Sequence, residues 1–230
     1  MKVILTGPTG YIGSEVLKQC ILNPSITSII ALSRRNFEPP MADPEKKLRV
    51  IIHSDFTCFS PEVLAELGGA QACIYCLGTN VPIKPPELNR QINFEFTLAT
   101  ATTFADELHG KLQANGRFRF VYLSGALPEK DPNKHLYFVA ENRKMRGELE
   151  NELLCLDHKN RSDGFEIYIA RPGFVLKDAS IRIALSWVLG WMFRFITLDC
   201  LGKAMVNLAV NGHKETLVED WMLKSLVEKD

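Results

Sequence analysis

The first seventeen residues, 1-MKVILTGPTGYIGSEVL-17, place three glycines where a strand-like run is followed by a helical pattern. Lys2–Thr6 is an apolar run of strand-forming residues, and the apolar positions of Tyr11–Leu22 recur at helical spacing. The glycines are Gly7, Gly10 and Gly13. Because glycine weakens both strands and helices, three of them at one junction indicate a backbone that turns sharply or lets something approach closely. The group expected to approach is a phosphate.

The spacing of the three glycines predicts how a diphosphate would bind. Gly7 would allow the tight turn, Gly10 would let the backbone approach the phosphates, and Gly13 would let the helix pack closely on the sheet. The first N–H groups of the helix and the positive end of its dipole would then face the anion. A P-loop is excluded because no Lys-Ser or Lys-Thr pair follows the last glycine.

Beyond this junction the chain alternates strand-like and helical segments. The expected strands are 2–6, 28–33, 49–53, 72–77, 117–124 and 166–170, and the expected helices are 11–22, 61–67, 88–109 and 138–156. The strand cores are short and rich in Val and Ile, which is typical of strands buried on both faces of a parallel sheet. The sequence therefore predicts an α/β fold with a doubly wound parallel sheet of the Rossmann type. We expect one domain over residues 1–230, with residues from about 174 to 230 forming a helical region on the substrate side.

Charge and composition narrow the class of partner. Lys plus Arg equals Asp plus Glu at 27 each, so we expect no nucleic-acid or anionic-membrane surface. The most apolar block, residues 183–196, is too short to span a bilayer and carries Arg194, so it predicts a core or interface helix. The N-terminal apolar run is too short for a signal peptide. A small-molecule substrate is expected, and self-association into a homo-oligomer stays open.

Two of the six cysteines, Cys73 and Cys76, form a CxxC pair that can indicate metal or redox chemistry. The surrounding stretch ACIYCLGT has the pattern of a buried strand, however, and no second Cys/His pair stands at metal-site spacing. We therefore expect buried thiols, no bound metal and a reducing, cytoplasmic location.

Several motifs together resemble the short-chain dehydrogenase/reductases. TGPTGYIG is similar to the TGxxGxxG fingerprint of that family, especially of its atypical and extended branches, and KMRGELENELL resembles the small Tat-interacting-protein-type and nucleoside-diphosphate-sugar-epimerase-like members. The resemblance covers roughly residues 1–210. It implies the fold, a nicotinamide dinucleotide and a set of cofactor-binding residues, which are Thr6, Gly7, Thr9, Gly10, Tyr11, Ile12, Gly13, Ser33, Arg34, Arg35, Asp55, Phe56, Leu77, Gly78, Thr79, Asn93, Arg171, Pro172 and Gly173.

The end of the second strand favours NADP over NAD. An NAD-binding protein typically places an acidic residue there, whereas this chain has Ser33-Arg34-Arg35. The two guanidinium groups would attract a 2′-phosphate that a carboxylate would repel. Asp55-Phe56 would flank the adenine, although a polar strand end beside a core phenylalanine is an equal alternative. Leu77-Gly78-Thr79 would pass under the ribose.

The reductases of this family resemble one another in a Tyr-x-x-x-Lys pair plus a serine, and the pair is missing here. No tyrosine of the chain is followed four residues later by lysine. The resemblance places Asn142 at the tyrosine position and Arg146 at the lysine position, and neither side chain releases a proton near neutral pH. Both are expected to orient a substrate through hydrogen bonds instead. Ser124, at the end of the fifth strand, is expected to hydrogen-bond a substrate carbonyl. Tyr137 is a candidate stand-in acid, or simply a packing residue.

Three functions remain open on these grounds. The first is an NADP(H)-dependent oxidoreductase acting on a small to mid-sized apolar carbonyl compound, with NAD as a possible substitute cofactor. The second is an isomerase, cyclase or dehydratase of the same fold. The third is a non-catalytic protein that senses NADPH or docks a partner.

Overall fold

The computed structural model describes residues 1–108, 116–125, 128–129, 131, 135, 140–177 and 194–228. Seven parallel strands form the central sheet in the order β3-β2-β1-β4-β5-β6-β9. Their bounds are Lys2–Thr6 (β1), Ser28–Ser33 (β2), Leu48–Ile52 (β3), Ala72–Tyr75 (β4), Phe118–Leu123 (β5), Phe165–Arg171 (β6) and Leu217–Glu219 (β9). This strand order is that of a doubly wound parallel sheet, which confirms the predicted fold class.

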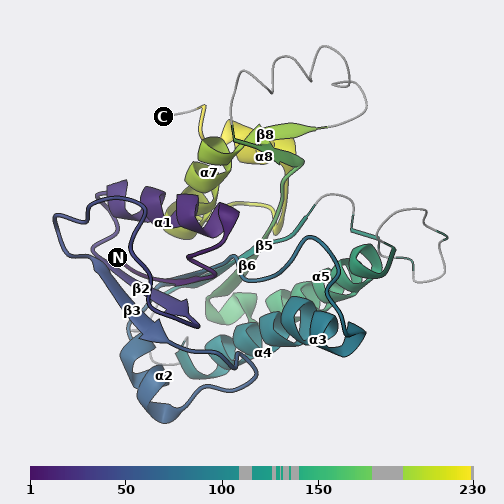
Figure 1. The fold of residues 1–230 in the computed structure, drawn as a ribbon, viewed down its shortest axis with the longest axis horizontal. Helices are drawn as coiled ribbons and strands as arrows, with labels where there is room; N and C mark the ends of the chain where they lie inside the picture. Colours follow the sequence, from purple (N-terminus) through teal and green to yellow (C-terminus); the bar gives the residue numbers. More distant parts are fainter. Residues whose placement is uncertain are drawn as a thin grey trace.

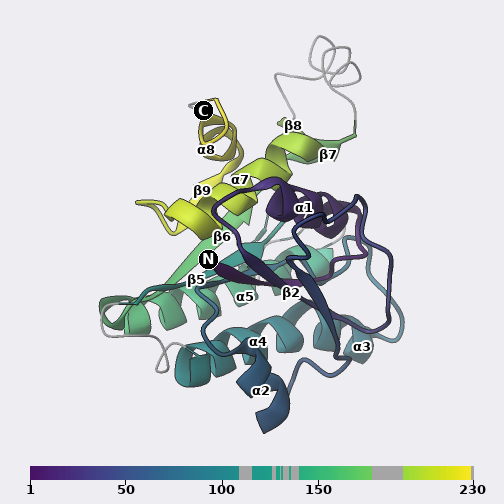
Figure 2. The same ribbon diagram turned by 90° about the vertical axis from the view of Figure 1, so that its left-hand side faces the viewer.

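Helices cover both faces of the sheet (Figures 1 and 2). The elements on one face are α1 (Tyr11–Leu22), α7 (Leu198–Asn211) and α8 (Asp220–Ser225). The elements on the other face are α2 (Pro61–Leu67), α3 (Pro86–Arg90), α4 (Phe96–Thr103) and α5 (Ala140–Asn160), with π-helical turns η1 (Gln91–Glu95) and η2 (Phe104–Leu108) on either side of α4. A 3₁₀ turn, η4 (Arg161–Asp163), follows α5. Among the described residues, no helix is long and apolar enough to cross a membrane.

Successive side chains of β1 pack alternately into the two hydrophobic cores on opposite faces of the sheet. Val3 and Leu5 pack with α1 and α7, whereas Ile4 faces the core formed with α4 and α5. All three side chains are fully buried. Successive side chains of a strand point to opposite faces, so a run that is apolar at every position requires cover on both sides.

The helical pattern predicted over 88–109 is a broken helix, since α3, η1, α4 and η2 follow one another without a loop. The third strand begins one residue earlier than predicted because Leu48 pairs with Ile29 of β2. The helix predicted over 138–156 begins within the described residues at Ala140 and continues to Asn160. The apolar block 183–196 lies outside the described residues except for its last residues, Phe195 and Ile196, and Arg194.

The C-terminal region contributes to the main body of the fold. Strand β9 pairs with β6 at the sheet edge, and α7 packs against α1 across the ends of β4 and β5. A separate two-stranded parallel sheet joins β7 (Phe174–Leu176) to β8 (Phe195–Thr197). Residues 194–228 therefore cover and extend the sheet in addition to any role beside a substrate.

Candidate functional site

The junction between β1 and α1 requires glycine at two positions. Gly7 has φ +66°, and a Cβ there would stand 2.7 Å from the carbonyl oxygen of Cys76. A Cβ on Gly13 would stand 2.0 Å from the carbonyl oxygen of Gly7. Both distances are far below van der Waals contact, so the turn and the first turn of α1 touch backbone to backbone. The interpretation of these two glycines from the sequence agrees with the packing.

The first turn of α1 presents an uncapped N-terminus. Gly10 is the N-cap residue, no side chain caps the helix, and no acidic residue stands in the first turn. Thr6 accepts hydrogen bonds through Oγ1 from the backbone N–H groups of Cys76 and Leu77, at 3.2 and 3.3 Å. This contact holds the carboxyl ends of β1 and β4 together beneath the turn. Helix N–H groups and the helix dipole thus face the sheet's carboxyl edge, where an anion would be stabilised.

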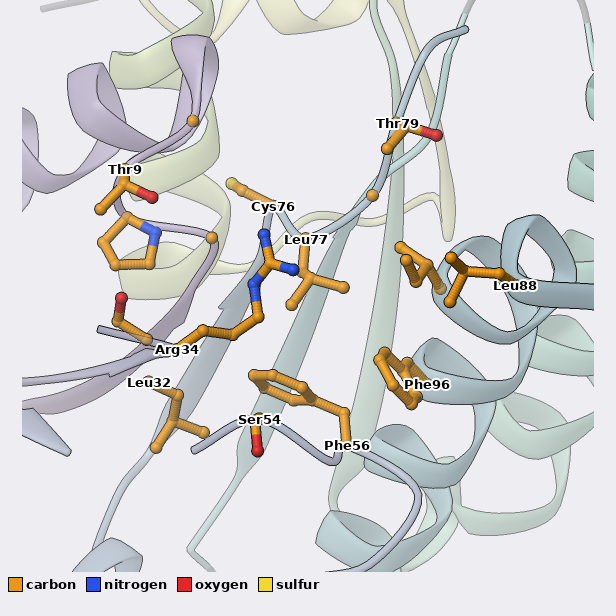
Figure 3. A pocket seen from close by; sticks show the side chains of 16 residues that line it. Thr9, Leu32, Arg34, Ser54, Phe56, Cys76, Leu77, Thr79, Leu88 and Phe96 are labelled. Atoms are coloured by element: carbon orange, nitrogen blue, oxygen red, sulfur yellow. The ribbon is translucent and has the colours of Figure 1, made fainter. Parts of the chain in front are cut away.

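A pocket of about 330 Å³ opens beside this turn (Figure 3). Its walls come from the glycine turn, from the ends of β2, β3 and β4, and from the broken helix. Phe56, Leu88 and Phe96 supply apolar surface, while the Arg34 side chain projects into the pocket. The lining residues are Gly7, Pro8, Thr9, Gly10, Leu32, Ser33, Arg34, Ser54, Phe56, Cys76, Leu77, Gly78, Thr79, Leu88, Ile92 and Phe96.

A second, smaller pocket of about 170 Å³ continues the first toward β5. The two share Gly10 and the segment Cys76–Thr79, so together they form one groove along the carboxyl ends of five neighbouring strands. Ligands of doubly wound folds bind at this edge. The inner pocket is lined by Gly10, Tyr11, Ile12, Gly13, Cys76, Leu77, Gly78, Thr79, Asn80, Asn93, Tyr122, Leu123, Ser124 and Arg146.

The residues after β2 and β3 separate into those that face the groove and those that do not. Arg34 lines the groove and makes no hydrogen bond or ion pair within the described residues, whereas Arg35 is exposed outside it. Ser33 is buried and donates to the carbonyl of Arg35 at 2.8 Å. Asp55 was predicted beside the adenine, but it is exposed, bonded to Thr57, and lines neither pocket.

Behind the inner pocket, Ser124 donates its hydroxyl proton to a buried carboxylate. The Ser124 Oγ lies 2.6 Å from Oε1 of Glu150, a fully buried residue of α5. Arg171 donates to the same carboxylate from Nε at 3.1 Å and also from Nη2. Its Nη1 reaches Glu219 at 2.9 Å. Because a hydroxyl has one proton, Ser124 offers lone pairs to a ligand in this arrangement, and its predicted role as donor to a carbonyl would require it to leave Glu150.

Asn142 was predicted at the substrate, but it is buried and lines neither pocket. Its Oδ1 accepts from Asn89 at 2.7 Å, and the Oδ1 of Asn89 accepts from Asn93 at 2.9 Å. Asn93 in turn accepts from the backbone N–H of Thr79 at 2.6 Å. This chain of amides ties α5 to the floor of the groove. Asn142 therefore supports the Thr79 segment, which lines both pockets.

The other predicted site residues occupy several different places. Tyr137 lies outside the described residues. Tyr122, which was not predicted, lines the inner pocket, but burial raises its pKa far above the ordinary value, so this phenol is a poor proton donor at neutral pH. Arg171, Pro172 and Gly173 line neither pocket, and the N–H of Gly173 donates to Asp220 at 3.0 Å. Glu150 was not predicted as a site residue, because α5 carries several acidic residues and its sequence does not show which of them is buried.

The fold favours the protonated form of both thiols of the CxxC pair. Burial raises the pKa of Cys73 and Cys76 well above the ordinary thiol value. Within the described part of the chain, no group of three or more His, Cys, Asp or Glu side chains could hold a metal ion.

The parallel sheet, the glycine turn and the groove define the Rossmann-type fold of the short-chain dehydrogenase/reductases. Solved structures with this fold include a UDP-N-acetylglucosamine 4-epimerase from Methanobrevibacter ruminantium (TM-score 0.67, 16% identity, 95% of this chain and 75% of that one). The oxidoreductase ylbE from Lactococcus lactis is similar over nearly its whole length (TM-score 0.64, 16% identity, 99% and 97%). Vestitone reductase from alfalfa also matches (TM-score 0.63, 17% identity, 95% and 76%).

Curated sequences identify a closer group. The chain is 32% identical to protein fmp52, mitochondrial, of Emericella nidulans over 91% of this chain and 89% of that protein. It is 32% identical to leucinostatins biosynthesis cluster protein T of Purpureocillium lilacinum over 94% and 87%. The chain belongs to the family of these proteins. No protein-family model matches it.

Proposed function

We propose that this protein binds NADP(H) in the groove and acts as an oxidoreductase on a small to mid-sized carbonyl compound. The carrying observation is the Arg34 guanidinium, which projects into the outer pocket without a partner among the described residues. The glycine turn and the uncapped start of α1 would receive the diphosphate, and Phe56 would pack against the adenine. Two solved structures of similar fold, MoeE5 with UDP-glucose and a dTDP-glucose 4,6-dehydratase from Streptomyces venezuelae, are described with NAD bound, which supports a nicotinamide cofactor here.

When bound, the nicotinamide would supply or accept the hydride. A residue of the chain must then donate a proton to the substrate oxygen or accept one from it, and the described residues offer few donors. Ser124 presents lone pairs, and Asn142 lies outside the groove. Tyr137 remains the proposed acid, because the resemblance places the loop before α5 at the active site. An apolar substrate wall from the block 183–196 also stays a proposal.

The engaged hydroxyl of Ser124 supports a second candidate. A groove that binds the cofactor but lacks a proton donor would suit an isomerase, cyclase or dehydratase without net redox change, or a protein that senses NADPH without catalysis. Measuring NADPH consumption over a panel of aldehydes and ketones separates the candidates. Tight NADPH binding with no oxidation by any compound would exclude the reductase.

The cofactor assignment is tested by Arg34→Asp. Losing a charged hydrogen bond costs about 1.5–3 kcal/mol, which corresponds to a roughly 10- to 150-fold weaker affinity for NADPH. NADH, which lacks the 2′-phosphate, should change less than about threefold. Arg35→Asp is the matched control, because it changes the same charge outside the groove. Equal losses for both dinucleotides in calorimetry would contradict the 2′-phosphate role.

The cytoplasmic location predicted from the sequence stays a proposal. The fmp52 relatives from Candida albicans and Emericella nidulans carry the word mitochondrial in their names. Fractionation of cells that express a C-terminally tagged chain would distinguish the two compartments.

A further inference from the structure

Arg146 brings a positive charge into the inner pocket, and no described carboxylate forms an ion pair with it. It is the charged side chain among the described lining residues of that pocket. Its bonds go to neutral oxygens, since Nη2 donates to the carbonyl of Thr79 at 3.1 Å and to Oδ1 of Asn80 at 2.9 Å. Half-buried cations usually have an anionic partner.

The surrounding backbone is shaped to hold this guanidinium. Gly125 directly follows Ser124, and a Cβ on Gly125 would stand 2.3 Å from Nη1 of Arg146. The missing side chain therefore leaves space that the guanidinium occupies, beside the end of β5. The hydrogen bonds to Thr79 and Asn80, together with the space beside Gly125, fix the guanidinium at the inner end of the groove. The Nε and Nη1 donors are left without a hydrogen-bond acceptor among the residues that the structure describes.

We infer that Arg146 binds a carboxylate of the substrate, so that the substrate is an organic acid whose reacting group lies near Ser124. This inference rests on the proposed function and adds the class of substrate to it. A single guanidinium without a second cation suits a monoanionic carboxylate, to which it donates charge-assisted hydrogen bonds. Ser124 would accept a hydrogen bond from a hydroxyl of the same molecule. The two side chains then present complementary polarity, a donor with positive charge and a lone-pair acceptor.

The test compares hexanoate with hexanamide, which share shape and chain length but differ in charge. Binding of each is measured by calorimetry to the full-length protein, both saturated with NADPH and free of it. We expect hexanoate to bind the wild-type protein at least about 10-fold more tightly than hexanamide, since a charged hydrogen bond is worth about that much. In Arg146→Gln, which removes the charge and leaves a shorter polar side chain, the ratio should fall to about one.

Two further variants separate this role from a structural one. Gly125→Ala should lower the ratio as well, because its methyl group displaces the guanidinium, which lies at the free end of a flexible side chain. Arg117→Gln is the matched control, because it removes the same charge at the opposite end of β5, where Arg117 pairs with Glu166. It should leave the ratio unchanged.

The outcomes distinguish the inference from the function on which it rests. Failure of the wild-type protein to bind NADPH would reject the proposed function, while the acid-to-amide ratio is still read on the free protein. An unchanged ratio in Arg146→Gln would overturn the carboxylate role. So would a 10-fold or greater loss of NADPH affinity in that variant with the ratio preserved, because Arg146 would then hold the cofactor.

Discussion

Alanine at Gly13 and at Gly10 should damage the protein in different ways. A Cβ on Gly13 would stand 2.0 Å from the carbonyl oxygen of Gly7, whereas carbon and oxygen need about 3.3 Å. The start of α1 or the turn must therefore move by more than ~1 Å, and both sides of the contact are backbone. Overpacking costs about 1–3 kcal/mol, and we expect about 3 kcal/mol here because neither partner can rotate away.

For a chain of this length, a change of about 3 kcal/mol corresponds to a Tm about 6–12 °C lower. Gly10→Ala is the matched control, because its Cβ would lie 3.3 Å from the same oxygen and its φ is −78°. We expect its Tm within about 3 °C of wild type. Its methyl group would, however, enter the groove where the diphosphate approaches, and NADPH affinity should fall at least about 10-fold.

Thermal unfolding followed by circular dichroism, and NADPH titration by fluorescence, measure the two effects. A Gly13→Ala protein with a Tm within 3 °C of wild type would refute the packing argument. A Gly10→Ala protein that binds NADPH normally would show that the diphosphate does not lie on this turn.

The remaining predictions concern buried charge and pH. Arg171→Met leaves the fully buried Glu150 without its cation and should lower the free energy of unfolding, measured by urea titration, by about 3–5 kcal/mol. Glu219→Gln removes the more exposed carboxylate that also pairs with Arg171, and it should lower the free energy of unfolding by under about 1 kcal/mol. Equal losses in the two variants would contradict the role of burial. Burial lowers the pKa of His53 below its ordinary value of about 6.5, so the unfolded chain binds the proton more readily and stability falls as the pH drops below about 6.5. His53→Phe keeps the ring stacked on Phe59 and should flatten that part of the profile of Tm against pH; an unaltered profile would exclude His53 as the source.

The elements whose bounds were predicted correctly share strong local signals. The first strand and α1 follow from the glycine spacing, and α2 follows from Ser60, whose side chain caps the helix, together with Pro61 at the first helical position. The short strands β7, β8 and β9 were missed because three residues carry too little periodicity. Helix α7 lies in the region predicted as helical, but its bounds were not predicted, although Thr197 before it and Gly212 after it are recognisable boundary residues.

More of the predicted residues line the outer pocket than the inner one. Glycines and strand-end residues have meaning at fixed sequence positions, and Gly7, Arg34 and Thr79 do line the outer pocket, while their role in binding a cofactor stays a prediction. The partnership of Ser124 with Glu150 depends on which face of α5 turns inward, and a helix with many acids hides the one that is buried. Burial of a charged residue is a tertiary property, and the local pattern does not contain it.

Helix α7 is synthesised late, although it covers one face of β1, the first strand to be synthesised. Val3 and Leu5 of β1 belong to the same buried cluster as Leu201 and Met205 of α7, nearly two hundred residues further along the chain. Until the stretch from Leu198 onward is made, that apolar face of the sheet is covered, among the described helices, by α1 alone and is prone to aggregation. A premature stop codon upstream of α7 would thus yield an aggregation-prone fragment instead of a smaller folded protein.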